Sequence, residues 1–377
     1  MTCFEPECDG TEFISATYSL KGTLDEARAM AHDICIEQTV EFPEDLVVWE
    51  DIRENIFGRV VSFETVSADL HTAVIDFPVE TAGNELTQLV NLLFGNISIK
   101  PGIRLTGFEL PPSLQEKFNG PAFGIDGMRR LLDAHERPLL ATALKPMGLS
   151  PTELADFAYQ FALGGMDIIK DDHGLADQAF CPFEQRITEC SRAVQGANSR
   201  TGRKCLYFPN ITAPFDLIES RARFARDAGA GGFVISCGLS GLDTMRFLAD
   251  SGEYDMPIMS HPALQGQFTV CSDHGIAPGV LWGKLNRLSG ADACIFPNYG
   301  GRFTLTKEDC AGIMRACSSE MGHFRPILPV PAGGMTLDKV SELVDFYGKD
   351  VVLLIGGDLH RHGPNLIQNC RKFFSIL

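Results

Sequence analysis

The stretch DIIKDDHG, from Asp167 to Gly174, ends a short apolar run with a lysine, two aspartates and a histidine in succession. This change is typical of a buried strand that stops at a polar edge. Seven other apolar runs lie between residues 139 and 355, and many of them also stop at a polar or glycine-containing turn. The intervals of about 25–40 residues mostly contain a helical pattern. The eight runs are 139–144, 167–169, 205–209, 233–236, 258–260, 293–297, 327–331 and 351–355.

Eight strand-then-helix units predict a (β/α)8 barrel. A doubly wound sheet is the alternative, although it usually has fewer strands and does not need eight evenly spaced units. In a barrel, the catalytic groups lie where the strands end. We therefore expect one barrel face to bring together Lys145, Lys170, Asp172, His173, Asn210, His261 and the pairs Gly333-Gly334 and Gly356-Gly357.

The part of the chain before the barrel has a different pattern. Residues 1–130 mix alternating runs such as 13–20 and 72–77 with helical stretches such as 24–38 and 84–94. This mixture predicts a smaller α+β domain. We expect this domain to span 1–130 and the barrel to span 131–377.

The composition limits the classes of partner. With a net charge of -17 the chain lacks the basic face that nucleic acid or an anionic membrane surface would need. No apolar run reaches the roughly 18 residues of a membrane span. The 12 cysteines are scattered without a C-x-x-C pair, which predicts reduced thiols in a cytoplasmic protein. A small anionic substrate remains compatible, because a few backbone N–H groups and one or two cations can hold a phosphate.

The charged cluster after Ile169 can be interpreted in two ways. A lysine beside carboxylates is often only a solvated surface ion pair. At a barrel strand end, however, a carboxylate with a histidine could hold a divalent metal. A lysine that loses proton affinity becomes nucleophilic, and it can react with CO2 to give a carbamate. We therefore expect Lys170, Asp172 and His173 to form a metal site.

The other strand-end residues suggest substrate contacts. Each Gly-Gly pair alone most often marks a tight turn, but two pairs after the last two strands stand where barrels often bind phosphate. Lys145 is a candidate catalytic or substrate-binding group, because a lysine is seldom buried without a task. His261 is either structural or catalytic.

Several motifs, in order along the chain, resemble the large subunit of ribulose-bisphosphate carboxylase/oxygenase (RuBisCO). They are FNGPAFGIDGMR (118–129), RPLLATALKPMGLS (137–150), GGMDIIKDDHG (164–174), HGIAPGVLWGKLNRLSGAD (274–292), LPVPAGG (328–334) and LLIGGD (353–358). The resemblance implies an α+β domain followed by a (β/α)8 barrel. It also implies a dimer, or a multiple of dimers, in which two subunits share each active site.

The resemblance also implies roles for particular residues. Lys145 matches the lysine that moves protons at the substrate, Lys170 the lysine that becomes carbamylated, and Asp172 a magnesium ligand. His261 matches an active-site histidine after strand five. The glycines Gly333, Gly334, Gly356 and Gly357 match the groups that hold one phosphate, and Glu37 and Asn96 match groups that reach over the substrate from the partner subunit.

The departures from the family pattern matter more than the matches. True carboxylases have KDDE where this chain has KDDH, so His173 replaces a magnesium-binding glutamate. Mg2+ prefers oxygen ligands, so the histidine weakens the case for Mg2+, and imidazole suits manganese, iron or zinc better. The resemblance to the family still leads us to expect Mg2+, with Mn2+ as the alternative. A family arginine, histidine and serine that hold the second phosphate are missing, with Pro262 and Ala332 at two of these positions. The flexible-loop lysine is also absent, and Arg302 is its cationic replacement.

With these losses, the chain resembles the RuBisCO-like proteins (form IV), the branch that does not fix CO2. The first hypothesis is isomerisation or enolisation of a singly phosphorylated ketose, such as 5-methylthioribulose 1-phosphate in methionine salvage. The second is decarboxylation or C–C cleavage of a branched 3-oxo sugar acid. The third is a non-catalytic relative that only binds its ligand.

Overall fold

The computed structural model describes residues 12–303 and 305–377, which divide into two compact units. The first unit contains the described residues up to Phe118 together with Gln267–Val280, and the second contains Asn119–Gly266 and Leu281–Leu377. The sequence alone placed the boundary at residue 130 and assigned residues 267–280 to the barrel. The structure places this segment in the first unit, because its strand β10 (Gly275–Ile276) pairs with β4 (Ile103–Glu109).

The first unit is built on a five-stranded sheet in the order β10-β4-β1-β3-β2. The pairs β4-β1, β1-β3 and β3-β2 are antiparallel, and β10 joins β4 in parallel. Alternate residues of β1 and β3 are buried, as expected for strands with one face on a core. The elements are β1 (Phe13–Lys21), α1 (Leu24–Glu37), η1 (Glu44–Leu46), α2 (Glu50–Asn55), β2 (Arg59–Ser67), β3 (Leu70–Pro78), η2 (Val79–Ala82), α3 (Leu86–Phe94), η3 (Asn96–Ile99), β4 and α4 (Pro112–Gln115).

The second unit is the predicted barrel. Its eight strands are parallel, in the order β7-β6-β5-β13-β12-β11-β9-β8. A bridge between Asn210, which follows β7, and Val234 in β8 closes the barrel. The strands are β5 (Leu139–Leu144), β6 (Ile168–Asp171), β7 (Leu206–Phe208), β8 (Phe233–Ile235), β9 (Ile258–Ser260), β11 (Ala293–Pro297), β12 (Leu328–Ala332) and β13 (Val352–Leu354), so each predicted run overlaps one strand.

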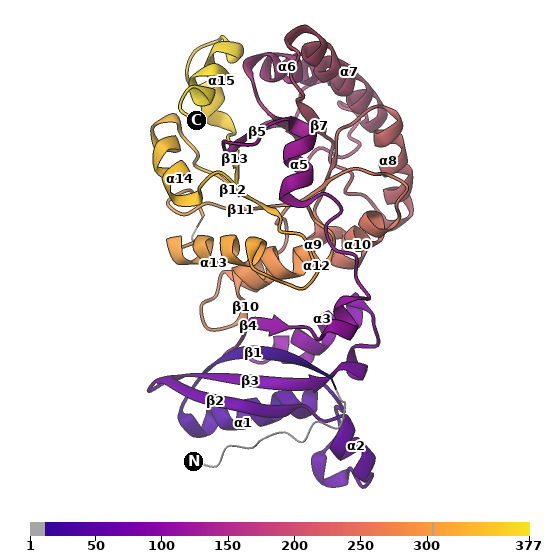
Figure 1. Cartoon of the computed structure of the whole chain (residues 1–377), viewed down its shortest axis with the longest axis vertical. Coiled ribbons are helices and arrows are strands. Elements are labelled where there is room, and N and C mark those ends of the chain that lie inside the picture. The colour runs from indigo at the N-terminus through magenta and orange to yellow at the C-terminus, as the bar shows by residue number, and fades with distance from the viewer. Residues whose placement is uncertain (1–11, 304) are drawn as a thin grey trace. The chain divides into compact units, whose positions relative to one another are not determined.

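Helices cover the outside of the barrel, as Figure 1 shows for α6, α7, α8, α14 and α15. A capping box of Ser150 and Glu153 begins α6, and one of Thr306 and Asp309 begins α13. The helical elements of the second unit are α5 (Gly124–Leu132), α6 (Pro151–Gly164), α7 (Phe183–Thr201), α8 (Phe215–Asp227), α9 (Cys237–Ser240), α10 (Leu242–Asp250), α12 (Asn286–Leu288), α13 (Lys307–Ser318), η5 (Leu337–Lys339), α14 (Val340–Tyr347), η6 (Gly357–His360) and α15 (Leu366–Phe374). From Gln267 on, α11 (Gly266–Thr269) belongs to the first unit, and η4 (Gly279–Leu285) begins in the first unit and ends in the second.

Small and branched side chains fill the barrel interior. Every strand contributes at least one buried residue to a single cluster, for example Ile168 from β6, Val234 from β8 and Val330 from β12. Fully burying a side chain of this size stabilises the fold by about 1.5–3 kcal/mol. The interior is therefore a packed core, which leaves the strand ends as the place for chemistry.

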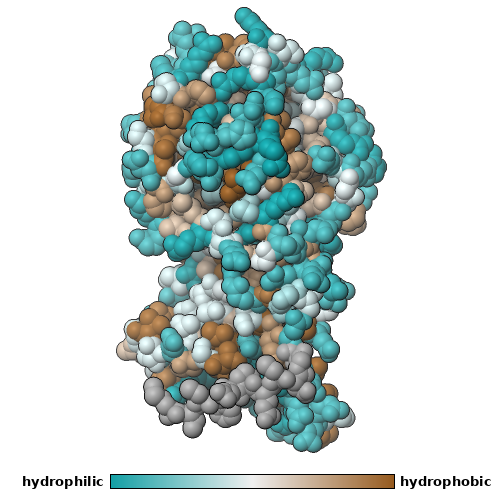
Figure 2. Space-filling model, in the orientation of Figure 1, coloured by the Kyte–Doolittle hydropathy of each residue, from teal (hydrophilic) through white to brown (hydrophobic). Residues whose placement is uncertain are grey.

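The surface of the barrel unit is mostly hydrophilic on the face shown in Figure 2. Within the described ranges, no helix combines the length and the apolar character that crossing a membrane requires.

Candidate active site

Side-chain alternation along β6 explains the order of residues in DIIKDDHG. Successive side chains of a strand point to opposite faces. Ile168 belongs to the barrel interior, so Lys170 points the same way, and Ile169 and Asp171 point outward to the helices. Lys170 and Asp171 therefore lie inside the strand, both buried, and Asp172 and His173 follow it.

Asp171 has a structural role that its neighbour Asp172 does not share. Its carboxylate accepts hydrogen bonds from Arg186 Nε of α7 at 3.0 Å, from the Tyr207 hydroxyl at 2.7 Å and from the backbone N–H of Asn210 at 3.0 Å. The side chains of Asp171 and Arg186 are fully buried. This ion pair joins β6 to the helix layer, and the alternation of β6 is the sequence signal that could have revealed it.

Replacing Asp171 with asparagine should destabilise the fold by about 3–5 kcal/mol, because it leaves the buried Arg186 without a counter-charge. Thermal unfolding measures this loss. The matched control is Asp172→Asn, which removes a carboxylate one position along and should change the melting temperature far less. Equal losses in the two variants would contradict the division of roles.

Five side chains form what we call the strand-end cluster: Lys145, Lys170, Asp172, His173 and His261. Lys145 forms an ion pair with Asp172. The Nδ1 atom of His173 lies 3.6 Å from Asp172 Oδ1, and the imidazole rings of His173 and His261 stack with centroids 4.2 Å apart. The structure thus brings together the predicted catalytic and metal-binding residues of the first strands and of β9.

The protein environment shifts the pKa of most groups in this cluster away from the ordinary value. Burial lowers the pKa of Lys170 to about 8. Burial, together with the positive charge of Lys170, lowers the pKa of His261 to about 2, and burial lowers the pKa of His173. Burial would raise the pKa of Asp172, but hydrogen bonds from Lys145 and Gly174 outweigh it and hold the pKa below its usual value. At neutral pH the site therefore contains an ionised carboxylate and two neutral imidazoles.

Hydrogen bonds also set the tautomer of His261. The backbone N–H of Ala263 donates to His261 Nδ1 at 3.2 Å. A neutral imidazole that accepts at one nitrogen carries its proton on the other. His261 therefore presents an Nε2–H donor rather than a base.

The donors fit a divalent cation only with a modified Lys170. No group of three His, Cys, Asp or Glu residues in the described part of the chain forms a metal site by itself. Asp172 Oδ1 and His173 Nδ1, 3.6 Å apart, are close enough to share one cation. A carbamate on the buried Lys170 would supply a third, oxygen ligand. Such a mixed set suits Mn2+ at least as well as Mg2+.

The loops after β11 and β12 approach each other through glycines. Gly333 and Gly334 have φ of +86° and +77°, a region that favours glycine. A Cβ on Gly334 would lie 2.9 Å from Gly301 Cα, and one on Gly301 would lie 2.4 Å from Gly333 O. Arg302, which follows Gly301, places its guanidinium over the Phe303 ring at 4.9 Å from the centroid.

The second glycine pair, Gly356-Gly357, is less closely packed than the first. A Cβ on Gly356 or Gly357 would meet no atom within 4 Å, so their backbone is open to a ligand. Asp358, the next residue, accepts from the backbone N–H of Leu337 at 3.0 Å and bonds His362 Nε2 at 2.9 Å. The loops that carry the two glycine pairs are thereby tied together. No sequence pattern predicts this role of Asp358, because nothing in its spacing marks a contact with Leu337.

Glu37 and Asn96 lie together in the first unit. Asn96 Nδ2 donates to Glu37 Oε1 at 3.2 Å, and Lys100 Nζ lies 3.2 Å from Glu37 Oε2. Glu37 ends α1 and Asn96 begins η3, so two separate elements build this polar group.

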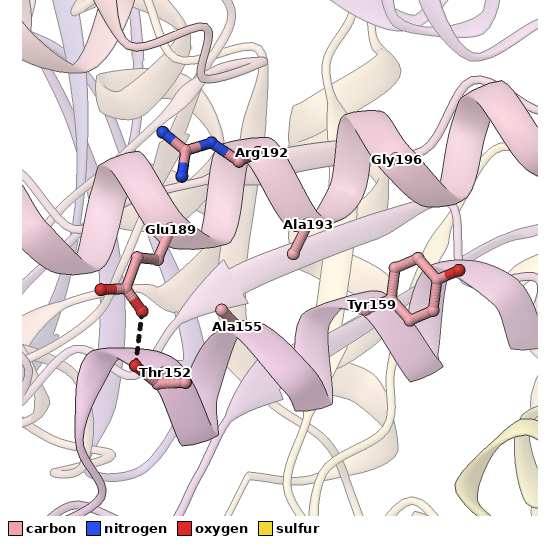
Figure 3. Close-up of a pocket in the computed structure, with 7 residues that line it drawn as sticks. All are labelled: Thr152, Ala155, Tyr159, Glu189, Arg192, Ala193 and Gly196. Carbon is pink, nitrogen blue, oxygen red and sulfur yellow. Dashed lines mark hydrogen bonds between the residues drawn. The ribbon is translucent and has the colours of Figure 1, made fainter.

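A surface groove lies elsewhere in the barrel unit. Figure 3 shows it between α6 and α7 on the outer helix layer, with Thr152 and Glu189 joined by a hydrogen bond of 2.8 Å. None of the predicted site residues lines it. The lining residues are Thr152, Ala155, Tyr159, Glu189, Arg192, Ala193 and Gly196.

The fold and the strand-end cluster can now be compared with known proteins. Residues 124–366 match the family model described as the ribulose bisphosphate carboxylase large chain, catalytic domain. The chain therefore belongs to the RuBisCO large-chain family.

Within this family, the similar proteins include RuBisCO-like proteins. The crystal structure of a Rubisco-like protein from Rhodopseudomonas palustris has a TM-score of 0.87 and 38% identity, and the match covers 97% of each chain. The 5-methylthioribulose-1-phosphate isomerase of Rhodospirillum rubrum is 39% identical over 96% of each chain. The 2,3-diketo-5-methylthiopentyl-1-phosphate enolase of Bacillus licheniformis is 33% identical, over 96% of this chain and 91% of its own length.

Proposed function

We propose that this protein moves a proton between carbons of a singly phosphorylated ketose, with 5-methylthioribulose 1-phosphate as the first substrate to test. The observation that carries the proposal is the strand-end cluster, in which a half-exposed amine and an ionised carboxylate stand beside a neutral imidazole donor. The likeness to the isomerase of Rhodospirillum rubrum supports the choice of substrate.

Lys145 is the proposed proton carrier. Its amine is exposed enough to reach a substrate, with 44% of the side chain accessible, whereas Lys170 is buried. Asp172 holds the ammonium in place through the ion pair. A positioned acid–base group of this kind typically contributes about 10²–10⁴-fold to a rate.

His261 is the proposed electrophile. Removing a proton next to a carbonyl puts negative charge on the carbonyl oxygen. A neutral imidazole that carries its proton on Nε2 can donate a hydrogen bond to that oxygen without a prior change of protonation state. Its donation grows stronger as the charge develops, which favours the transition state over the substrate.

Lys170 is proposed to carry CO2 as a carbamate. With its pKa near 8, a fraction of the amine is neutral at physiological pH and can attack CO2, releasing one proton. Asp172, His173 and the carbamate would hold Mg2+ or Mn2+, which would supply further polarisation of the substrate oxygens.

The glycine pairs are proposed to hold the single phosphate, with Arg302 as an additional cation. Backbone N–H groups that lack a covering side chain suit phosphate oxygens. We further propose a homodimer, or a multiple of it, in which Glu37 and Asn96 of one subunit complete the site of the other.

The test is turnover of 5-methylthioribulose 1-phosphate by the full chain in D2O, after incubation with bicarbonate and Mg2+ or Mn2+. The products are followed by 1H, 13C and 31P NMR. A product that keeps all its carbons and its phosphate, with solvent deuterium on a carbon or with a repositioned carbonyl, supports the proposal. Release of CO2 or of a smaller fragment from a branched 3-oxo sugar acid would replace it with lyase chemistry. Ligand binding by calorimetry without turnover of either substrate would identify a non-catalytic relative.

Replacing Gly334 with alanine should raise KM about ten- to hundredfold with a smaller change in kcat. The left-handed backbone strains any side chain, and the new Cβ would press on Gly301. Steady-state kinetics measure KM, and competition with inorganic phosphate measures its inhibition constant. Both constants should rise together.

Gly202→Ala is the matched control for this glycine. Gly202 ends α7 with φ of +71°, and a Cβ there would meet no atom within 4 Å. The control carries the same backbone strain without the contact, so its KM should stay at the wild-type value. An unchanged KM in Gly334→Ala would remove this loop from the phosphate site.

A further inference from the structure

A buried network of polar side chains includes residues on both sides of His261 in the sequence. Trp282 Nε1 donates to Gln265 Oε1 at 3.0 Å, and Gln265 Nε2 donates to Cys237 Sγ at 3.3 Å. Cys237 and Asn286 are joined at 3.6 Å, and Asn286 Nδ2 donates to Ser260 Oγ at 2.8 Å. All five side chains are buried. Two members of the network lie near His261 in the sequence: Ser260, one residue before it, and Gln265, four residues after it.

The loop itself needs this external support. Leu264 has φ of +66°, an unfavourable backbone conformation for a side chain of its kind. Such a conformation costs about 1–3 kcal/mol and persists only when its surroundings impose it. Gln265 supplies this constraint at the end of the turn, where its backbone N–H also bonds Pro262 O at 3.1 Å.

Close packing against α9 further limits the loop. A Cβ on Gly238 would lie 2.4 Å from Ala263 O and 2.8 Å from Gln265 Cγ. The backbone of Ala263, which sets the tautomer of His261, is thus pressed against a glycine. Ala263 O and Gln265 Cγ therefore both pack against Gly238.

We propose that Gln265 is the positioning residue of His261, acting through its hydrogen bonds to Trp282 and Cys237. The hydrogen bonds of Gln265 go to Trp282, Cys237 and Pro262, and none of these residues belongs to the strand-end cluster. Its contribution is to hold the 261–265 turn so that Ala263 keeps His261 Nδ1 as an acceptor. This inference rests on the proposed function only for the catalytic role of His261.

The test uses the full chain with Gln265→Met, which keeps the length of the side chain and removes both hydrogen bonds. A misplacement of about 1 Å can cost about a hundredfold in rate, so we expect kcat to fall about ten- to hundredfold with little change in KM. Hydrogen–deuterium exchange of peptides covering residues 258–266 should become faster. In a Trp49→Phe background, Trp282 is the sole tryptophan of the 377 residues, and its emission should change in Gln265→Met.

Two further variants separate positioning from a general loss of stability. Asn198→Leu removes an amide that bonds the backbone N–H and C=O of Cys205 at the other end of the barrel strands. It should lower the melting temperature without changing exchange at 258–266 or kcat. Trp282→Phe should repeat the kcat loss of Gln265→Met, and the double variant should lose no more than either single variant.

The outcomes also separate this inference from the proposed function. Wild-type kcat and exchange in Gln265→Met would overturn the positioning role, even if the isomerase reaction is confirmed. If the wild type turns over no ketose phosphate, the proposed function fails, and exchange and Trp282 emission still decide whether Gln265 holds the His261 loop.

Discussion

Replacing Lys170 with methionine should abolish turnover and make the fold more stable. The amine is buried, and its lowered pKa means that the barrel disfavours its charge. Methionine fills a similar volume without that charge. From a folded pKa of about 8 against an ordinary value near 10.4, the gain should be roughly 3 kcal/mol. The loss of rate should exceed about 10³-fold, because the proposed carbamate and the metal that it would hold are lost together. Thermal unfolding and turnover assays measure the two effects.

The stability gain should depend on pH in a definite direction. Because the folded-state pKa of Lys170 is lower than the unfolded one, the folded chain binds fewer protons between about pH 8 and 10. The penalty for burying the ammonium is therefore complete below pH 8 and is relieved as the pH rises toward 10. The advantage of Lys170→Met should shrink over the same range. A variant less stable than the wild type at pH 7 would contradict this account.

A 13C NMR spectrum with 13C-bicarbonate tests the modification directly. A carbamate signal that needs both the metal and Lys170 would support the proposed site. Absence of the signal with Mg2+ and with Mn2+ would remove the carbamate from the mechanism, and Lys145 and His261 would then have to act without it.

Replacing Lys145 with methionine should lower kcat about 10²–10⁴-fold while KM changes little. The amine is the exposed member of the strand-end cluster, and its proposed task is proton transfer rather than binding. Steady-state kinetics with the ketose phosphate measure the loss. Exchange of substrate hydrogen into D2O should fall in parallel, because it reports the same proton transfer.

Lys145→Arg distinguishes proton transfer from electrostatics. Arginine can keep an ion pair with Asp172, but it does not give up its proton at working pH. We expect it to be as inactive as methionine. Recovery of most of the rate in Lys145→Arg would show that position 145 supplies charge and not a proton.

The barrel was accessible from the sequence because its strands are short apolar runs with long, helix-containing intervals. Each of the eight runs overlaps one strand, and the family match confirms the resemblance. The strands β4 and β10 escaped the prediction. β4 alternates only weakly, and β10 is a two-residue strand whose pairing depends on a residue about 170 positions away.

The candidate site could be predicted only in part, for a related reason. Strand ends identify Lys145, Lys170, Asp172, His173 and His261, because a barrel collects them on one face. The hydrogen bonds that fix the loops of the site come from other loops, and no local sequence pattern predicts them. Asp358 reaches Leu337, and Gln265 reaches Trp282 and Cys237, only because the chain folds them together.

The two adjacent aspartates at the end of β6, Asp171 inside the strand and Asp172 just after it, have a consequence for how such a barrel can diversify. Asp171 is committed to Arg186 in the helix layer, whereas Asp172 and His173 follow the strand and belong to the strand-end cluster. Under the proposed function, substitutions at positions 172 and 173 would therefore change the metal ligands while the ion pair between Asp171 and Arg186 persists. A replacement such as histidine for glutamate at position 173 is an evolutionary step that this arrangement tolerates, because the residue that holds the strand in place is a different one.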